Sequence, residues 1–286
     1  MKSRLSSILV LVLAVSWLSV DARAGTIDFG TAGPFAVLGE AGVTNTGPST
    51  IYGSVSGSIG TPAVTGFTFS TSPGPGTVIP PGVGYITGVS SPFSDATTAY
   101  NALVSLAPTQ VLTGQDLGGL TLNPGVYFFA SSAQLTGTLI LDALGSDDAT
   151  WTFQIGSTLT TASASSVEVI DAGAGSFTGG INWAVGSAAT LGTTTAFLGT
   201  IISNSAASTL DTGATIGCGR VISLGAAVTL DDNIIATPST CVAAEGGGGT
   251  PIITAPLSPV PEPGTLISTG LVAIGLLTLR KSRAHR

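Results

Sequence analysis

The central part of this 286-residue chain has almost no basic residues. Between Gly25 and Val260 there is no lysine and no histidine, and Arg220 is the one arginine. Without an imidazole, a Ser-His-Asp or Cys-His mechanism has no base, and zinc or iron has no histidine ligand. One arginine also gives too little positive charge to recognise phosphate or nucleic acid. We therefore expect no metal site, no cofactor and no nucleic-acid partner.

Charged residues of either sign are scarce, at 8%, whereas glycine occurs 40 times and hydrophobic residues make up 43%. This composition is typical of a secreted, turn-rich β protein with an ample core. An enzyme would have to depend on carboxylates such as Asp147, Asp148, Asp231 and Asp232, which could bind calcium or act in pairs in a polysaccharide lyase or hydrolase. Adjacent aspartates at turns are more often solvated corners, so we expect no catalytic residues and no enzyme.

Three tandem segments, SAATLGT, AASTLDT and AAVTLDD, share one pattern. Their threonines, Thr190, Thr209 and Thr229, are spaced by 19 and 20 residues, and repeats of this length predict a solenoid of stacked supersecondary units. If the leucine after each threonine is buried, strand alternation turns the threonine and the alanine two residues before it outward. The predicted outward residues are Ala188, Thr190, Ala207, Thr209, Ala227 and Thr229. They form an exposed threonine and alanine face.

Earlier segments extend this pattern more loosely. Thr121 lies between Leu120 and Leu122, Thr138 precedes Leu139, and Thr158 and Thr160 flank Leu159. Strand alternation turns these threonines outward, and we expect Thr121, Thr138 and Thr158 to continue the threonine and alanine face.

One stretch has helical rather than strand periodicity. Residues 94–107 have apolar side chains at helical spacing, a possible cap at Ser94 or Asp95, and Pro108 as the end signal. The apolar positions are Ala96, Tyr100, Leu103, Val104 and Ala107. We expect this helix to pack along the flank of an otherwise all-β domain. The preceding residues 61–92 are too rich in proline, glycine, serine and threonine for regular strands, and we interpret them as a loop or cap over one end of the stack.

The two ends of the chain have sequence patterns typical of targeting signals. Residues 1–24 have the positive start, apolar segment and Ala22-Arg23-Ala24 cleavage site of a signal peptide, and the folded domain is expected over 25–242. In an exported protein, Cys218 and Cys241 could form a disulfide, although free buried thiols stay possible. Residues 243–259 are interpreted as a glycine- and proline-rich linker.

Residues 260–286 contain Pro261-Glu262-Pro263, an apolar stretch over 265–279 and a basic tail. Fifteen residues are short for a permanent membrane span, which needs about 20. This ending resembles the PEP-CTERM sorting signal of Gram-negative bacteria. The resemblance implies transient membrane anchoring, processing by an exosortase near Pro261-Glu262-Pro263, and an extracellular or cell-surface product after export across the inner membrane.

The region from about Phe35 to Ile235 resembles the ice-binding-like family, DUF3494. The segments that carry the resemblance include FAVLGEAGVTNTG, DATTAYNAL, LTLNPGVYFF, WTFQIGSTLTT and TLDTGATIGCGRVISLGAAVTLDDNII. It implies an irregular right-handed β-solenoid of triangular section, with a long helix alongside, a cap at one end, and a first coil that packs near the last ones. The family motif Thr-Ala/Gly-X-Thr/Asn matches once, at Thr212-Gly213-Ala214-Thr215.

The resemblance implies adsorption to ice, with inhibition of ice growth and recrystallisation. The predicted ice-binding residues are Thr121, Thr138, Thr158, Ala188, Thr190, Ala207, Thr209, Ala227 and Thr229, and we expect a monomer. Arg220 is assigned to structure, as a tie between a coil and a nearby carboxylate or carbonyl. The alternative is a cell-surface or biofilm-matrix adhesin that binds polysaccharide through the same face, and ice activity separates the two.

Overall fold

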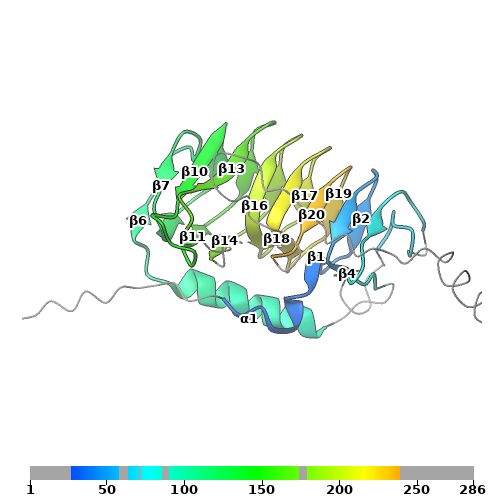
Figure 1. Ribbon diagram of the computed structural model, residues 1–286. Coiled ribbons are helices and arrows are strands. Elements are labelled where there is room, and N and C mark those ends of the chain that lie inside the picture. The colour runs from blue at the N-terminus through cyan, green and yellow to red at the C-terminus, as the bar shows by residue number, and fades with distance from the viewer. Residues whose placement is uncertain (1–26, 58–63, 71, 86–89, 174–178, 239–286) are drawn as a thin grey trace, which may run out of the picture.

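The computed structural model describes residues 27–57, 64–70, 72–85, 90–173 and 179–238. The described chain is mostly β, with a fourteen-stranded sheet, a six-stranded sheet and one α-helix, α1 (Ser91–Ser105) (Figure 1). Every strand pairing among these residues is parallel. The all-β prediction with a single helix is therefore confirmed.

The pairing registers group the strands into three parallel ladders. The six-stranded sheet is the first ladder: β9 (Ala133–Leu135), β12 (Leu159–Thr161), β15 (Ala189–Leu191), β17 (Ser208–Leu210), β19 (Val228–Leu230) and β2 (Val43–Asn45). The helix-side ladder contains β6 (Gln110–Val111), β8 (Gly125–Phe129), β11 (Thr150–Ile155), β14 (Gly180–Val185), the C-terminal halves of β16 (Ala196–Ser203) and β18 (Thr215–Ser223), β1 (Phe35–Gly39) and β4 (Ser54–Gly57).

The third ladder contains β7 (Thr121–Leu122), β10 (Thr138–Asp142), β13 (Ser166–Ile170), the N-terminal halves of β16 and β18, β20 (Ile234–Ala236), β3 (Thr50–Tyr52) and β5 (Thr77–Val78). Strands β16 and β18 serve two ladders because their pairing shifts register between Leu198 and Thr200. Gly199 has φ +96°, and a Cβ there would lie 2.4 Å from the Ile181 carbonyl oxygen, so this corner requires glycine.

The first strands of the chain pair with the last ones. β1, β2 and β3 add to β18, β19 and β20, respectively, and Figure 1 shows the blue N-terminal strands beside the yellow and orange C-terminal strands. Helix α1 then runs along the stack and returns the chain to β6 at the opposite end. The expectation that the first coil packs near the last ones is confirmed.

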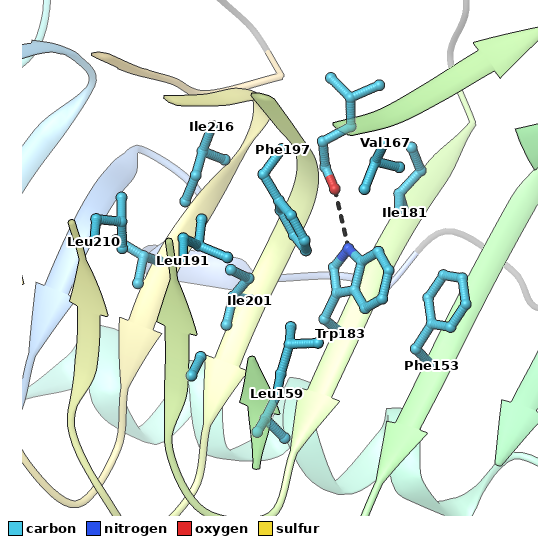
Figure 2. Packing of buried hydrophobic residues seen from close by; sticks show 14 of the residues in the cluster. Phe153, Leu159, Val167, Ile181, Trp183, Leu191, Phe197, Ile201, Leu210 and Ile216 are labelled. Carbon is cyan, nitrogen blue, oxygen red and sulfur yellow. Dashed lines mark hydrogen bonds between the residues drawn. The ribbon is translucent and has the colours of Figure 1, made fainter. Parts of the chain in front are cut away.

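Aromatic side chains fill the core between the ladders (Figure 2). The Trp183 ring stacks on Phe153, with ring centroids 3.8 Å apart, and lies 4.8 Å from Phe197. Its indole nitrogen donates a hydrogen bond of 3.0 Å to the Leu198 carbonyl. Both residues that alternate inward with Phe153, Trp151 and Ile155, are buried as predicted. Because the strands pair in parallel, core side chains of successive strands lie one above the other.

Helix α1 begins earlier than predicted. Its N-cap is Ser90 and makes no side-chain capping bond, while Pro92 occupies the first turn, where its missing N–H costs nothing. Ser94 and Asp95, the predicted caps, therefore lie inside the helix. Its buried side chains are Pro92, Phe93, Ala96, Ala99 and Leu103.

The prediction was also wrong at the helix C-terminus. The helix ends at Ser105, and Leu106 is already extended, so Ala107 is not helical. Val104 is 42% exposed rather than buried. Pro108 disfavours helical backbone at Ala107, so the helix ends before that residue.

Residues 64–70 and 72–85 lie against the β2–β3–β4 end of the stack. Strand β5 pairs with β3, which corrects the expectation that this segment has no regular strand, and Val64 and Phe67 enter the core. Cys218 forms a disulfide, whereas Cys241 lies outside the described residues. The predicted signal peptide, linker and sorting signal also lie outside them. No helix in the described part is long and apolar enough to cross a membrane.

Candidate functional site

Five threonines lie in direct register across the outer surface of the six-stranded sheet. Thr160 pairs with Thr190, Thr190 with Thr209, Thr209 with Thr229, and Thr229 with Thr44. We call these five residues the threonine row. Neighbouring parallel strands are about 4.8 Å apart, so its four steps cover about 19 Å. An isolated bridge between Thr44 and Thr65 adds a sixth threonine at one end, while Gln134 is the register partner of Thr160 at the other.

The row faces solvent because the residues on either side of each threonine are buried. Leu191, Leu210 and Leu230 are at most 1% exposed, as are Ala189, Ser208 and Val228. Thr160 and Thr44 are exposed, whereas Thr190, Thr209 and Thr229 are partly exposed between their neighbours. The predicted orientation of all three repeats is confirmed.

The hydroxyls of the threonine row are free to bind water. Within the described residues, no threonine of the row donates or accepts a side-chain hydrogen bond. The backbone is held by the ladder, so row spacing does not depend on the hydroxyls. Each threonine therefore presents a methyl group and an unused hydroxyl at a fixed position, which suits a ligand that is itself an ordered array of water.

A second row of small side chains lies beside the threonine row. Ala188, Ala207 and Ala227 each precede the buried first residue of a strand and are partly exposed. Thr158 occupies the equivalent place before β12, as predicted, but its hydroxyl donates a 2.8 Å hydrogen bond to Ser132. The three alanines keep the sheet flat beside Thr190, Thr209 and Thr229, because their side chains do not extend beyond Cβ.

Carboxylates lie only at the edge of this surface. Asp211 and Asp231 follow β17 and β19 directly and are partly exposed. The Asp231 carboxylate accepts hydrogen bonds from the hydroxyls of Thr46 and Thr212, and the Asp231 N–H donates to the Asn233 side chain at 2.7 Å. Its charge is thus engaged at the corner between two ladders. No cluster of three metal-ligating side chains occurs within the described ranges.

Two predicted site residues lie elsewhere. Thr121 belongs to β7 and Thr138 to β10, both in the third ladder, so the prediction that they continue the threonine and alanine face is wrong. The Thr138 hydroxyl is 2.8 Å from that of Ser166, which donates to Glu168 at 3.2 Å. Leucine-threonine alternation looks the same on any ladder, so this local pattern cannot assign a strand to a sheet.

The third ladder is less suited to contact with an ordered water array. Its outward positions include the charged Glu168 and the 40% exposed Ile234. The family-like motif at Thr212–Thr215 lies at the corner that leads into it: Thr212 is exposed, Ala214 is buried, and Thr215 begins β18. The threonine row, by contrast, contains no charge and no large apolar side chain.

Helix α1 covers the helix-side ladder. The Gln154 side-chain nitrogen, on β11, donates hydrogen bonds of 2.8 Å to the carbonyls of Leu103 and Leu106 at the helix C-terminus. Phe93, Ala96 and Ala99 pack against Ala184, Ile202 and Ile222 of the strands. Because this ladder is covered by the helix, the outward side chains of the six-stranded sheet and of the third ladder are the ones that the described structure leaves accessible to a ligand.

Thr44 and Thr65 were missed by the sequence reasoning. They lie in the N-terminal part of the chain, and the 19- and 20-residue repeats contain no information about it. A usable signal was present in Val43-Thr44-Asn45, whose in-out-in pattern matches Val228-Thr229-Leu230, its register partner. Thr160, predicted to point outward, does so.

Arg220 has the structural place that was expected. It is 8% exposed, and its Nε and Nη2 atoms donate hydrogen bonds of 3.1 and 2.7 Å to the Gly33 carbonyl. Nη1 donates to the Thr200 hydroxyl at 3.2 Å, and the guanidinium carbon lies 4.6 Å from the Phe29 ring centroid. Burial lowers the pKa of Arg220 to about 10, so the side chain is charged at neutral pH.

The chain is similar to known ice-binding proteins. A family model described as ice-binding-like matches residues 37–236. An ice-binding protein of Nostoc sp. (strain HG1) is 44% identical over 238 residues, covering 81% of this chain and 82% of that protein. An ice-binding protein of Colwellia sp. is 32% identical, covering 74% and 84%, respectively. The crystal structure of an ice-binding protein from the ascomycete Antarctomyces psychrotrophicus superposes with a TM-score of 0.63 at 34% identity, covering 73% of this chain and 97% of that one.

Proposed function

The chain belongs to the ice-binding-like family, and we propose that it adsorbs to ice through the threonine row and the alanines beside it, and so inhibits ice growth and recrystallisation. The observation that carries this proposal is the register of five solvent-facing threonines whose hydroxyls make no hydrogen bond within the described residues. The assigned residues are Thr44, Thr160, Thr190, Thr209 and Thr229, with Ala188, Ala207 and Ala227.

The physical argument concerns the water that already covers this surface. Methyl groups at fixed spacing order the water above them, and the hydroxyls hydrogen-bond waters at positions repeated every 4.8 Å or so. Charged side chains would hold hydration shells of their own, and none occurs in the row. An ordered water layer of this kind can join a growing ice surface without first being displaced. The free energy of adsorption gained per threonine is small, but the threonines of the row contribute together.

We propose that the stack is an irregular right-handed β-solenoid of triangular section. Its support is the division of the strands into three parallel ladders and the similarity to family structures. In such a solenoid one side can be assigned to the helix and another to ice, because the three sides share one backbone spacing but not one set of side chains. This assignment involves no catalysis, and the family match points to no enzyme.

Export and sorting form a further part of the proposal. We propose a signal peptide over 1–24, a domain over 25–242 that acts as a monomer, and a PEP-CTERM signal over 260–286. An exosortase would process this signal after transient anchoring in the membrane, leaving an extracellular or cell-surface product. The support is the sequence pattern of the two ends. Mass spectrometry of the mature protein would show both termini, and a mature chain that retains residues 260–286 would contradict the processing step.

Ice adsorption is tested with the purified protein on single ice crystals. We expect faceted growth, a thermal hysteresis gap, and incorporation of fluorescently labelled protein into a growing ice hemisphere. Bovine serum albumin at the same concentration controls for nonspecific effects. Round crystals and exclusion of a well-folded protein from ice would contradict the proposal, and binding to purified exopolysaccharide in the same sample would then favour the adhesin alternative.

A further inference from the structure

The threonine row crosses a seam between distant parts of the chain. β19 and β2 are neighbours in space, but Thr229 and Thr44 are 185 residues apart in sequence. The last two threonines at this end, Thr44 and Thr65, therefore belong to an N-terminal segment that must dock on the C-terminal strands. Their alignment with the rest of the row depends on how that segment is held.

Burial alone specifies the register of β1, the first strand of this segment, weakly. All five residues of β1 are buried, and its apolar side chains enter both the main core and the cluster beneath α1. A strand that is apolar on both sides has no polar face to exclude a shifted pairing. A shift of β1 along β18 would move β2 and displace Thr44 from the row, so a contact that recognises one position is needed.

Arg220 supplies such a contact. It lies in β18, next to Val221, which pairs with Val37 of β1, and its forked hydrogen bonds end on one carbonyl, that of Gly33, two residues before β1. The third bond, to Thr200, fixes the guanidinium on the neighbouring strand β16. A planar fork with a charged donor is directional, and a buried cation that lost its acceptor would be left unsatisfied. The contact therefore penalises any other register of the N-terminal segment.

We propose that Arg220 is a positioning residue that, by holding Gly33, sets the register of the N-terminal strands and keeps Thr44 and Thr65 in line with the threonine row. The effect on ice rests on the proposed function, whereas the effect on register does not. The seam itself is marked by backbone hydrogen bonds from Glu40 to Ser223, from Ala41 to Ala226 and from Thr46 to Leu230, at 2.9, 3.1 and 3.0 Å.

Hydrogen exchange tests the register effect without ice. In Arg220→Met, which keeps the apolar stem but removes the fork, we expect the amides of Glu40, Ala41 and Thr46 to exchange about tenfold faster or more, the loss associated with a charged hydrogen bond. The amides of Leu159 and Ala162, which bond within the other end of the same sheet, should keep their wild-type rates. In Arg220→Lys, which can donate one bond to Gly33, the increase should be smaller. Equal acceleration at both ends, or no acceleration at the seam, would overturn the proposal.

A double-mutant cycle then tests the effect on ice. Thr44→Tyr and Thr160→Tyr are each made in the wild type and in Arg220→Met, and the lowest concentration that arrests recrystallisation is measured. If Arg220 acts through the seam, Thr44→Tyr should reduce recrystallisation inhibition only slightly further in the Arg220→Met background. Thr160→Tyr should reduce it there as much as in the wild type. Equal additional losses at both positions would overturn the positioning role. A wild-type protein without ice activity would refute the proposed function and leave the exchange result to decide the register effect.

Discussion

Gln154 offers a way to weaken the fold without touching the proposed ice surface. Its side chain is 5% exposed and satisfies two carbonyls at the C-terminus of α1, each at 2.8 Å. Gln154→Met has a similar length and no donor, so it removes both hydrogen bonds. The Leu103 carbonyl still accepts the Leu106 N–H at 3.3 Å, whereas the Leu106 carbonyl loses the Gln154 donor. Each lost bond is worth about 1 kcal/mol, and the one carbonyl left without a donor adds up to about 2 kcal/mol.

We therefore expect the free energy of unfolding to fall by about 2–4 kcal/mol. For a domain of this size each kcal/mol lowers Tm by about 2–4 °C, which gives a decrease of about 4–16 °C in calorimetry. Ice recrystallisation inhibition, measured near 0 °C where the variant is folded, should match the wild type, because the helix-side ladder is separate from the threonine row.

Thr152 provides the matched control on the same strand. Its hydroxyl is fully buried and has no hydrogen-bond partner among the described residues. Thr152→Val removes a polar atom that gains nothing from burial, so stability should be unchanged or higher. A Gln154→Met variant with wild-type Tm would refute the reasoning about the helix anchor, and a folded variant that lost ice activity would refute the separation between the helix side and the ice side.

Three more predictions follow from the core, the charges and the flatness of the surface. Trp183→Ala should lower the free energy of unfolding by about 3–5 kcal/mol in urea titrations, because it empties the ring stack between Phe153 and Phe197, whereas Val104→Ala on the exposed side of α1 should change it by less than about 0.5 kcal/mol. The Thr31 hydroxyl and then its N–H donate to Asp95 and lower the pKa of that carboxyl, so its contribution to stability is present above the unfolded-state pKa of 3.8 and is lost as pH falls through the lower folded-state value. In Asp95→Asn, the Tm measured in thermal melts should fall less at acid pH than it does in the wild type. Ice activity should be constant from about pH 5 to 9, since no titratable group lies in the threonine row. Ala207→Lys should reduce thermal hysteresis by adding a hydrated charge beside the row, whereas Ala196→Lys, on the third ladder one strand earlier in the chain, should leave it unchanged; equal effects at both sites would contradict the assignment of the face.

The three repeats made part of the site predictable from sequence. Because Leu191, Leu210 and Leu230 recur at nearly constant spacing, strand alternation alone oriented the threonines before them, and parallel pairing placed them in register. The structural role of Arg220 was also predictable, since the one cation of a domain without lysine needs an oxygen acceptor when it is buried.

Other parts depended on pairings that local patterns do not encode. Thr44 joins the row through a contact between strands 185 residues apart, and Thr121 and Thr138 are assigned to another ladder by the corners between strands. The start of α1 was placed late because Ser94 and Asp95 resemble caps, whereas Pro92 in the first turn was the better signal.

Two threonines of one turn of the chain allow a direct comparison between the threonine row and the third ladder. Thr209 lies in the threonine row, and Thr215, six residues later, begins β18 in the third ladder; both are partly exposed. Each is changed to tyrosine, folding is verified by circular dichroism, and thermal hysteresis is measured at equal concentration. We expect Thr209→Tyr to abolish most of the hysteresis and Thr215→Tyr to retain it. Hysteresis that survives Thr209→Tyr and disappears in Thr215→Tyr would show that ice binds the third ladder and not the threonine row.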